Sequence, residues 1–280
     1  MNTDLAQFIQ SAIEEDVAQV GDITTLATIP KNQTGQAHFL VKEDCIIAGV
    51  EMVNHIAHAV DVNLDLEFKV QDGDQVNKQQ VIGIIKGSIH SILLAERLML
   101  NCMQRMSGIS TKVNRLKNMI SAYPAKILDT RKTTPNFRLA EKWAVRIGGG
   151  VNHRFGLYDM ILIKDNHIKA TGSVTNALIA TREYCEAAKI DKTVLVEVKN
   201  QQELLEALDF DFVSRILLDN MTPSEVAKMV ELNQQRKPLE VSGGIRQDNI
   251  VAYAVTGVDF ISIGDLTHHI ESVDISLKII

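Results

Sequence analysis

The chain has 280 residues, of which 45% are hydrophobic and 23% are charged, and its formal net charge at pH 7 is −6. This composition is typical of a globular protein with one large domain or two smaller ones, and it excludes the disordered and fibrous classes. The negative net charge also argues against nucleic acid as a partner, because a phosphate backbone requires a basic surface.

The segment MNTDLAQFIQSAIEED at the start carries acids where a signal peptide carries Lys or Arg. No run approaches the roughly 18 apolar residues of a membrane-spanning helix, so we expect a cytoplasmic protein that does not associate with membranes. The cysteines are far apart and form no CxxC pair, which predicts buried free thiols rather than disulfides or a metal site. They are Cys45, Cys102 and Cys185.

The first hundred residues have the pattern of a mixed α/β unit. Spacing of apolar residues predicts a helix over 5–16, and short β-rich runs predict strands at 37–42, 66–70 and 81–87, with a turn at 72–74. Residues 90–120 follow as one long helix, or two helices in line. Its apolar residues recur at spacings of three and four. We expect the helix to be weakest at Gly108 and the Arg105 side chain to be solvated.

From residue 126 the pattern changes to short apolar strands that alternate with longer helical or loop segments, as in a parallel sheet that is open or closed into a barrel. No strand is followed directly by GxGxxG, and no GxxxxGK[ST] occurs, which argues against dinucleotide and P-loop sites. The predicted strands cover 126–130, 145–150, 160–165, 193–198, 215–220, 239–244 and 258–265, and the predicted helices cover 175–190, 201–208 and 222–236.

Polar residues stand at the carboxyl ends of these strands. They are Asp129 to Lys132, Lys164, Glu197, Asp219, Ser242 and Gly264. In a β/α barrel these ends converge on one face, where the active sites of the fold are built. Strand-end charges often only face solvent, but Lys164 and Glu197 adjoin or interrupt apolar runs, where an unpaired charge costs several kcal/mol. This cost favours a functional site.

The types of residue indicate the ligands. Segment 131–169 holds eight lysines or arginines and three acids, a local charge of +5, which fits a small anionic ligand and a basic surface stripe equally well. Arg131, Arg154 and Lys164, with His153 adjoining, suit two carboxylates, or a carboxylate and a phosphate together. The glycine-bearing turns at 242–245 and 263–265 favour phosphate.

Glu197 and Asp219 occupy successive strands. They are suited to Mg²⁺ or to ribose hydroxyls, and the alternative is that they only pair with Lys164 or Lys199.

Long motifs in this order resemble the family of nicotinate-nucleotide pyrophosphorylases (carboxylating), also called quinolinate phosphoribosyltransferases. The similarity covers nearly the whole chain and includes EDVAQVGDITT, AERLMLNCMQRMSGIST, LDTRKTTPNFRLAEKWAVRIGGGVNHRFGLYDMILIKDNHI, VEVKN, LLDNM, VSGGI and ISIGDLTH. The resemblance implies an α/β fold with an N-terminal sandwich domain at 1–108, joined by the tail 270–280, and an open seven-stranded β/α barrel at 109–269. It also implies a homodimer with shared active sites.

The implied reaction is decarboxylating phosphoribosyl transfer from phosphoribosyl pyrophosphate to quinolinate, which forms nicotinate mononucleotide, pyrophosphate and CO₂ in NAD biosynthesis with Mg²⁺. By resemblance, quinolinate is bound by Thr130, Arg131, His153, Arg154, Lys164 and the partner's Arg105. Phosphoribosyl pyrophosphate is bound by Lys132, Glu197, Asp219, Ser242, Gly243, Gly244, Ile263, Gly264 and Asp265. Lys132, Glu197 and Asp219 are the expected catalytic residues, and the two acids hold the metal directly or through substrate or water.

Three alternatives stay open at this stage. A related nicotinate or molybdenum-linked transferase would keep the phosphoribosyl subsite with fewer cations. An aldolase-like barrel would use Lys164 as a Schiff-base nucleophile. A catalytically idle paralogue would have lost Lys132, Glu197 or Asp219, all of which are present.

One residue departs from the family pattern. Asp265 stands where members of the family usually have a small residue, directly after the glycine that matches Gly264.

Overall fold

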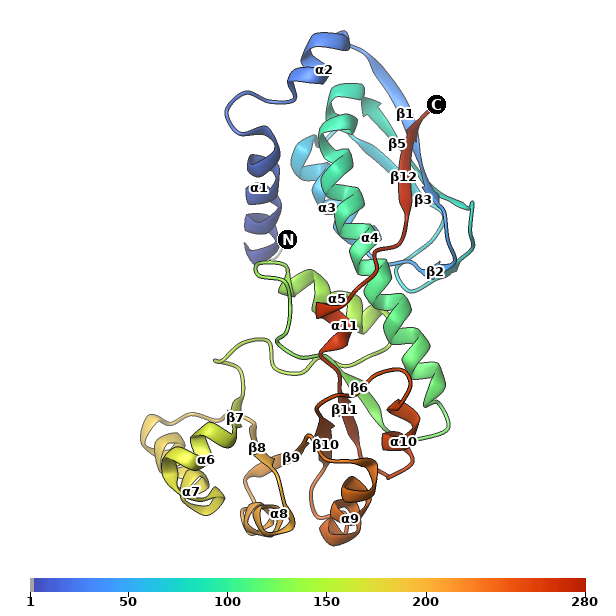
Figure 1. Ribbon diagram of the computed structural model, residues 1–280. Coiled ribbons are helices and arrows are strands. Elements are labelled where there is room, and N and C mark those ends of the chain that lie inside the picture. The colour runs from blue at the N-terminus through green and yellow to red at the C-terminus, as the bar shows by residue number, and fades with distance from the viewer. Residues whose placement is uncertain (1–2) are drawn as a thin grey trace. The chain divides into compact units, whose positions relative to one another are not determined.

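The computed structural model describes residues 3–280, and its contacts divide the chain into two units (Figure 1). The first comprises Met1–Asn114, Thr133–Gly149 and Leu266–Ile280, and the second comprises Arg115–Lys132 and Gly150–Asp265. The family resemblance predicts one domain at 1–108 with the tail 270–280 and a second at 109–269, and this stays a prediction. The contacts also group residues 133–149 with the first unit. One reason is that the Ser110 hydroxyl donates a hydrogen bond of 2.7 Å to the Ala144 carbonyl.

The first unit is built on a four-stranded antiparallel sheet in the order β12-β1-β5-β3. Its strands are β1 (Thr34–Val41), β3 (Asp65–Phe68), β5 (Val81–Ser88) and β12 (Ile275–Ile279), and β2 (Cys45–Ile46) pairs separately with β4 (Gln75–Val76). Alternate residues of β1 are buried, since Ala37, Phe39 and Val41 face the core while His38 and Leu40 between them are only half-buried. The C-terminal strand β12 thus pairs with β1 near the start of the chain.

The helices of this unit are α1 (Thr3–Val17), α2 (Ile23–Thr28), α3 (Val50–Val60), α4 (Ile89–Met119) and α5 (Arg138–Ile147). Figure 1 shows α3 and the start of α4 beside the sheet. Helix α4 is unbroken, so the prediction of a weak point at Gly108 was wrong. A Cβ at Gly108 would collide with the backbone carbonyl of Glu271, so the glycine allows a close approach of two chain segments rather than a bend.

The second unit contains six parallel strands in the order β6-β11-β10-β9-β8-β7. They are β6 (Lys126–Leu128), β7 (Ile161–Ile163), β8 (Val194–Val198), β9 (Val213–Asp219), β10 (Leu239–Ser242) and β11 (Phe260–Ser262). The last strand pairs with the first, and Val151 adds a parallel bridge to Leu128 on the other side of β6. The arrangement is therefore an open β/α barrel whose gap lies between Val151 and β7, which confirms the predicted fold class. Six strands form the sheet rather than the predicted seven, because only the Val151 bridge stands where a seventh strand was expected.

Helices connect successive strands, and Figure 1 shows α7, α8 and α9 side by side along the sheet. Their predicted positions are confirmed within about three residues, because each begins at a clear capping residue. Ser173, Asn200 and Thr222 each accept a hydrogen bond from the third helical residue. The helices of this unit are α6 (Asp165–Thr171), α7 (Val174–Ala188), α8 (Gln201–Leu208), α9 (Pro223–Asn233) and α10 (Ile250–Ala254), and α11 (Asp265–His268) follows β11.

One predicted strand, at 145–150, was wrong. Residues 138–147 form helix α5, whose buried positions Ala140, Ala144 and Val145 recur at helical spacing, and only Val151 beyond the glycines makes a strand-like bridge. The glycine run 148–150 ends the helix, and Gly149 has a φ of +89°.

The cysteine prediction is confirmed for two of the three residues. Cys45 and Cys102 are buried free thiols, and burial raises the pKa of each to about 12, whereas Cys185 is only half-buried. None of the helices between residues 3 and 280 combines the length with the apolar character that a membrane span requires.

Candidate active site

The polar residues that follow the strands of the second unit lie at one end of its sheet. Thr130, Arg131 and Lys132 follow β6, Lys164 follows β7, Glu197 is the fourth residue of β8, and Asp219 and Ser242 end β9 and β10. Residues 263–265 follow β11. Parallel pairing sets Asp219 directly opposite Ser242, so these carboxyl ends are aligned across neighbouring strands. This end of the sheet is the candidate active site.

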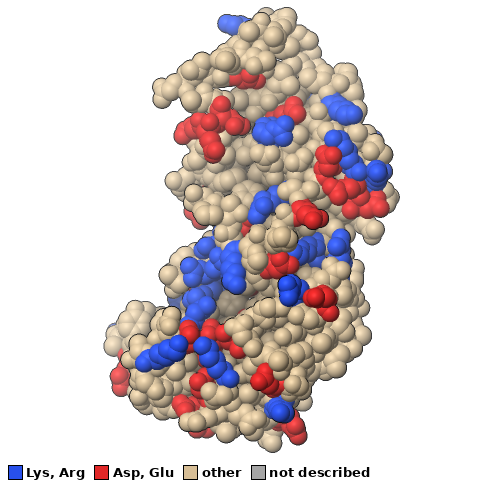
Figure 2. Space-filling model, viewed as in Figure 1, with Lys and Arg blue, Asp and Glu red and all other residues tan. Residues whose placement is uncertain are grey.

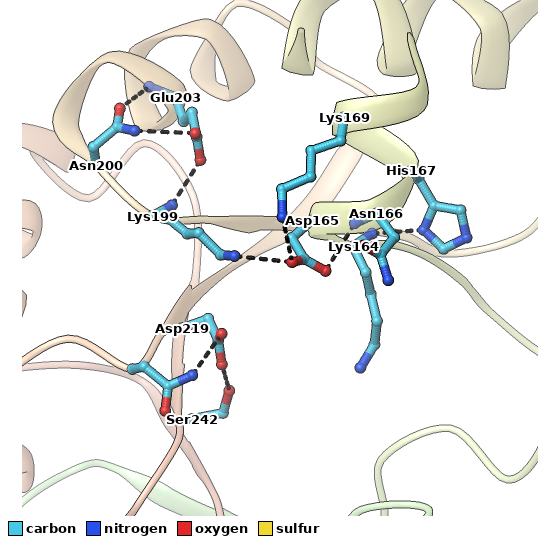
Figure 3. Close-up of polar contacts among 11 residues, drawn as sticks. Lys164, Asp165, Asn166, His167, Lys169, Lys199, Asn200, Glu203, Asp219 and Ser242 are labelled. Carbon is cyan, nitrogen blue, oxygen red and sulfur yellow. Dashed lines mark hydrogen bonds and ion pairs between the residues drawn. The ribbon is translucent and has the colours of Figure 1, made fainter. Parts of the chain in front are cut away.

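Two carboxylates on adjacent strands form its acidic part. Glu197 is only 7% exposed, and burial, followed by the neighbouring charge of Asp219, raises its pKa, while Lys164 acts in the opposite direction. Asp219 accepts hydrogen bonds from the Ser242 hydroxyl at 3.1 Å and from the side-chain amide of Asn220 at 2.7 Å (Figure 3). The chain therefore holds two acids close together in a site that disfavours the charge of Glu197.

The raised pKa of Glu197 predicts a pH-dependent gain in stability for Glu197→Gln. Above the folded-state pKa, the wild type carries a buried charge in the folded state that the variant lacks, so the variant should have the larger free energy of unfolding. The gain should vanish below about pH 4, where the wild-type carboxyl is protonated in both states. Urea denaturation at pH 8 and pH 4 measures it, and the exposed Glu186→Gln is the control that should show no such dependence.

Lys199 is one of the two lysines considered as simple pairing partners of these acids, and it forms its ion pair with Asp165 instead. The charges of Glu197 and Asp219 still act on Lys199 and contribute to its raised pKa. Its ammonium lies 3.0 Å from Asp165 at the start of α6, and Lys169 lies 3.5 Å from the same carboxylate. A hydrogen bond from Lys199 lowers the pKa of Asp165, and the same bond raises the pKa of Lys199. In Figure 3 the Lys164 side chain points away from this cluster, and no contact is drawn to its amine. The charge of Lys164 also lowers the pKa of Glu197, so this lysine acts on an acid of the site.

Arg131 and Arg154 form the cationic part of the site. Arg154 is 9% exposed, and burial, then the charge of Arg131, lowers its pKa against the attraction of Asp159. The Nε of Arg131 is buried and has no hydrogen-bond partner between residues 3 and 280. An unsatisfied buried donor costs about 1–3 kcal/mol. One of these two neighbouring guanidinium groups has a lowered pKa and the other has an unsatisfied donor. Together they favour the binding of an anion with more than one carboxylate. On the face shown in Figure 2, Lys and Arg side chains gather in a group with carboxylates beside it.

The ring of His153 is engaged within the protein on both sides. Its Nδ1 accepts a hydrogen bond of 2.7 Å from the Arg154 backbone amide, and its Nε2 lies 3.3 Å from the carboxylate of Glu240. The backbone amide of His153 donates to Asp129 at 2.7 Å, and Asp129 is completely buried. The structure therefore places His153 beside Arg154 as expected, but with its ring nitrogens already hydrogen bonded.

The turn after β10 has the backbone geometry of an anion site. Gly243 and Gly244 have φ values of +99° and +62°, which residues with a side chain rarely adopt. A Cβ on Gly243 would collide with Asn220, whereas Gly244 is exposed and has open space around its Cα. A ligand can thus approach this backbone closely. The second predicted phosphate turn runs from the buried Ile263 through Gly264 to Asp265, which opens α11.

Arg105 belongs to the first unit and is not the solvated side chain that the helical pattern suggested. Its Nε donates to Glu141 at 2.8 Å, and its terminal nitrogen donates to the Thr134 hydroxyl and to the Thr267 carbonyl, each at 3.0 Å. Glu141 also accepts from the Thr134 amide at 3.1 Å and has no exposed side-chain surface. The arginine is therefore held in a defined position on α4.

Removal of the buried carboxylate of Glu141 should lower the free energy of unfolding. Glu141→Ala leaves Arg105 half-buried without its charged partner, so we expect a loss of about 3 kcal/mol in the free energy of unfolding. Urea denaturation measures this, with the exposed Glu186→Ala as the control. Equal stability of the two variants would show that the pair does not hold Arg105 in place.

Glu197 and Asp219 are the side chains of the site that could hold a metal ion. Between residues 3 and 280, no group of three or more His, Cys, Asp or Glu is arranged to hold an ion. Glu197 and Asp219 provide two hard carboxylates whose mutual repulsion a cation would relieve. Mg²⁺ typically takes one or two carboxylates and completes its shell with substrate phosphates and water. The site fits that mode of binding.

Comparison with known proteins accounts for both units. Residues 109–278 match the C-terminal domain of quinolinate phosphoribosyl transferase, and residues 22–107 match its N-terminal domain. The chain belongs to the quinolinate phosphoribosyltransferase family. It is 44% identical to quinolinate phosphoribosyltransferase [decarboxylating] 1 of Nicotiana glauca over 99% of this chain and 82% of that protein.

Bacterial members of the family are similar over the whole length. A probable nicotinate-nucleotide pyrophosphorylase [carboxylating] of Bacillus subtilis is 38% identical over 95% of this chain and 90% of its own. The solved structure of the nicotinate-nucleotide pyrophosphorylase from Francisella tularensis superposes with a TM-score of 0.92 at 38% identity, covering 100% of this chain and 97% of that one. The family resemblance noted in the sequence is thus confirmed.

Sequence reasoning missed one charged residue of this end of the sheet. Glu240 lies within β10 between Leu239 and Val241 and is completely buried, yet it was not singled out. The signal was present, because Glu197 was recognised by the same pattern of an acid inside an apolar strand. Glu141 was missed for a different reason, since an acid in a helix usually faces solvent.

Proposed function

We propose that this protein transfers the phosphoribosyl group of phosphoribosyl pyrophosphate to quinolinate with loss of CO₂, forming nicotinate mononucleotide in NAD biosynthesis. It is then a glycosyltransferase of the pentosyl class. The observation that carries the proposal is the pair of neighbouring arginines, Arg131 with an unsatisfied buried Nε and Arg154 nearly buried, at the same sheet end as two acids and a glycine turn. The names of the relatives support the same reaction.

The reaction has two steps. The ring nitrogen of quinolinate gives an electron pair to the anomeric carbon of the ribose, and the bond from that carbon to the pyrophosphate oxygen breaks with its pair. The carboxylate next to the ring nitrogen then leaves as CO₂. The electron pair of the broken bond stays on the ring carbon, stabilised by the adjacent positive nitrogen, and a proton takes the place of the carboxylate.

The side chains divide between the two substrates. Arg131, Arg154 and Lys164, with Thr130, hold the quinolinate carboxylates, and His153 adjoins them. Glu197 and Asp219 hold ribose hydroxyls as the ring gains positive charge, and Lys132 stabilises the departing pyrophosphate. When bound, Mg²⁺ neutralises pyrophosphate charge, with Glu197 and Asp219 as its protein-side partners. Residues 242–244 and 263–265 bind the 5′-phosphate through their backbone amides.

The assay that tests this function uses purified protein with Mg²⁺, phosphoribosyl pyrophosphate and carboxyl-labelled quinolinate, with nicotinate in parallel. Release of both CO₂ and pyrophosphate from quinolinate alone is the expected result. Pyrophosphate released with nicotinate, and no CO₂ from quinolinate, would reassign the activity to a nicotinate transferase. Borohydride trapping of a carbonyl substrate on Lys164 would indicate aldolase-like chemistry instead.

A homodimer with shared active sites is also part of the proposal, with Arg105 serving the partner's quinolinate subsite. Arg105→Ala and Lys132→Ala should each be nearly inactive alone. Mixed dimers would contain one site free of both substitutions, so mixing the two under conditions of subunit exchange should restore activity. No recovery despite demonstrated mixed dimers would contradict shared sites.

We also propose a cytoplasmic location. Plant relatives carry organelle names, including the chloroplastic protein of Arabidopsis thaliana and a mitochondrial protein of Nicotiana tabacum. Fractionation of the native host, with detection of the protein by antibody, tests this location.

A further inference from the structure

The carboxylate of Glu240 is the centre of a buried polar network in the second unit. Glu240 has no exposed surface and accepts hydrogen bonds from Arg215 at 2.8 Å and from the Ser262 hydroxyl at 2.5 Å. Its third partner is Nε2 of His153 at 3.3 Å. The Arg215 guanidinium in turn stacks 4.0 Å above the ring of Phe260. Three donors from separate segments therefore fix this carboxylate in one orientation.

The network keeps Glu240 ionised. Burial by itself raises its pKa, but the hydrogen bonds from His153, Ser262 and Arg215 and the charge of Arg215 act against burial and favour the ionised carboxylate. An ionised carboxylate only accepts hydrogen bonds, so the nitrogen that faces it must carry a proton. Nε2 of His153 is that nitrogen.

The other side of the ring determines the tautomer. Nδ1 of His153 accepts from the backbone amide of Arg154 at 2.7 Å, and an imidazole nitrogen that accepts a hydrogen bond carries no proton. The ring is therefore neutral, with its proton on Nε2 directed to Glu240. Neither ring nitrogen is left to donate to a carboxylate of a substrate.

These bonds hold the segment that presents Arg154. Residues 152–160 contain no helix or strand, so the usual backbone hydrogen bonds do not place the arginine. The His153 amide is bound by Asp129 at 2.7 Å, and the amides of Phe155 and Gly156 are bound by Asp159 at 2.6 and 3.0 Å. The amide of Arg154 itself is bound by the His153 ring. Buried or half-buried acceptors thus anchor each residue from 153 to 156.

We propose that Glu240 is a positioning residue for quinolinate binding, which acts by fixing the His153 ring and through it the backbone amide of Arg154. His153 is then a positioning residue as well, rather than a ligand that donates to a quinolinate carboxylate. This inference rests on the proposed function for the identity of the ligand. The hydrogen-bonding state of His153 does not depend on that function and can be measured without substrate.

The first test measures the tautomer by NMR on protein labelled with ¹⁵N-histidine. The chain has eight histidines, so His153→Gln identifies the resonances of this ring by their loss. We expect an unprotonated Nδ1 and a protonated Nε2 in the free wild-type protein, with both unchanged when quinolinate is saturating. A doubly protonated ring, or an Nε2 resonance that shifts to a new acceptor on saturation, would make His153 a direct ligand and overturn the proposal.

The second test compares Glu240→Gln with Ser262→Ala by calorimetric titration of quinolinate and of phosphoribosyl pyrophosphate. Both variants lose a hydrogen bond of the same buried carboxylate, but only Glu240→Gln alters the acceptor of His153. We expect Glu240→Gln to raise the Kd for quinolinate by about 10-fold, the lower end of the effect of removing the hydrogen-bond partner that orients a metal-ligating histidine. Its Kd for phosphoribosyl pyrophosphate should stay within about twofold of the wild-type value, as should both constants of Ser262→Ala.

The outcomes separate this inference from the proposed function. Equal weakening of both substrates in Glu240→Gln, or equal effects of the two variants, would reduce Glu240 to a structural residue and overturn the inference. Unchanged quinolinate binding in Glu240→Gln would overturn it as well, with the proposed function intact. Wild-type protein that binds no quinolinate would overturn the proposed function together with the role of Glu240 in it.

Discussion

Lys132→Ala should lower kcat by about 100- to 1000-fold and change the KM for quinolinate only a few-fold, because removal of one group that stabilises developing charge has this effect in other enzymes. Lys132 follows β6 and is exposed, and its backbone amide donates to the Thr130 hydroxyl at 3.0 Å, which shapes the turn that presents it. A cation about 4 Å from a leaving pyrophosphate contributes roughly 4 kcal/mol at an effective dielectric constant of 20, before desolvation.

Steady-state kinetics with each substrate varied in turn measures this effect. Lys169→Ala is a suitable control, because Lys169 is also an exposed lysine of this unit and its ammonium pairs with Asp165 at 3.5 Å. If Lys132→Ala instead raised the KM for quinolinate and left kcat normal, the roles of Lys132 and Arg154 would be the reverse of those assigned.

Arg154→Ala should raise the KM for quinolinate by about 10- to 100-fold, since a charge-assisted hydrogen bond contributes roughly 1.5–3 kcal/mol, and should leave kcat within a few-fold. It should not lower the thermal midpoint by more than a few degrees. Burial and the charge of Arg131 already lower the pKa of Arg154, which means that the folded protein holds this charge at a cost. Removing it relieves that repulsion.

Kinetics and thermal unfolding on the same preparations test both parts. Arg146→Ala, which removes an exposed arginine from the last turn of α5, is the control and should change neither property. A large drop in thermal midpoint for Arg154→Ala would mean that the arginine is structural, and a loss of kcat with unchanged KM would place it at the reacting bond.

Much of the barrel unit could be predicted from sequence because its signals are local. Strand β8 and helices α7, α8 and α9 lie close to their predicted positions, since uninterrupted apolar runs and capping residues are read over a few neighbours. The same local reading failed at 145–150, where Val145 and Ile147 suggested a strand. This segment forms a helix because a helix buries Ala140 and Ala144 on one face, and that burial depends on distant parts of the chain.

The sequence by itself therefore determined the fold class and which residue types stand at the strand ends, because period and composition are properties of consecutive residues. Only the tertiary structure decided which polar groups satisfy one another. It paired Lys199 with Asp165, left Arg131 Nε without a partner among residues 3–280, and joined His153 to Glu240 across 87 residues of sequence. Hydrogen bonds act over about 3 Å and require aligned atoms, so such pairings arise from the way the strands are brought together rather than from the order of residues along the chain.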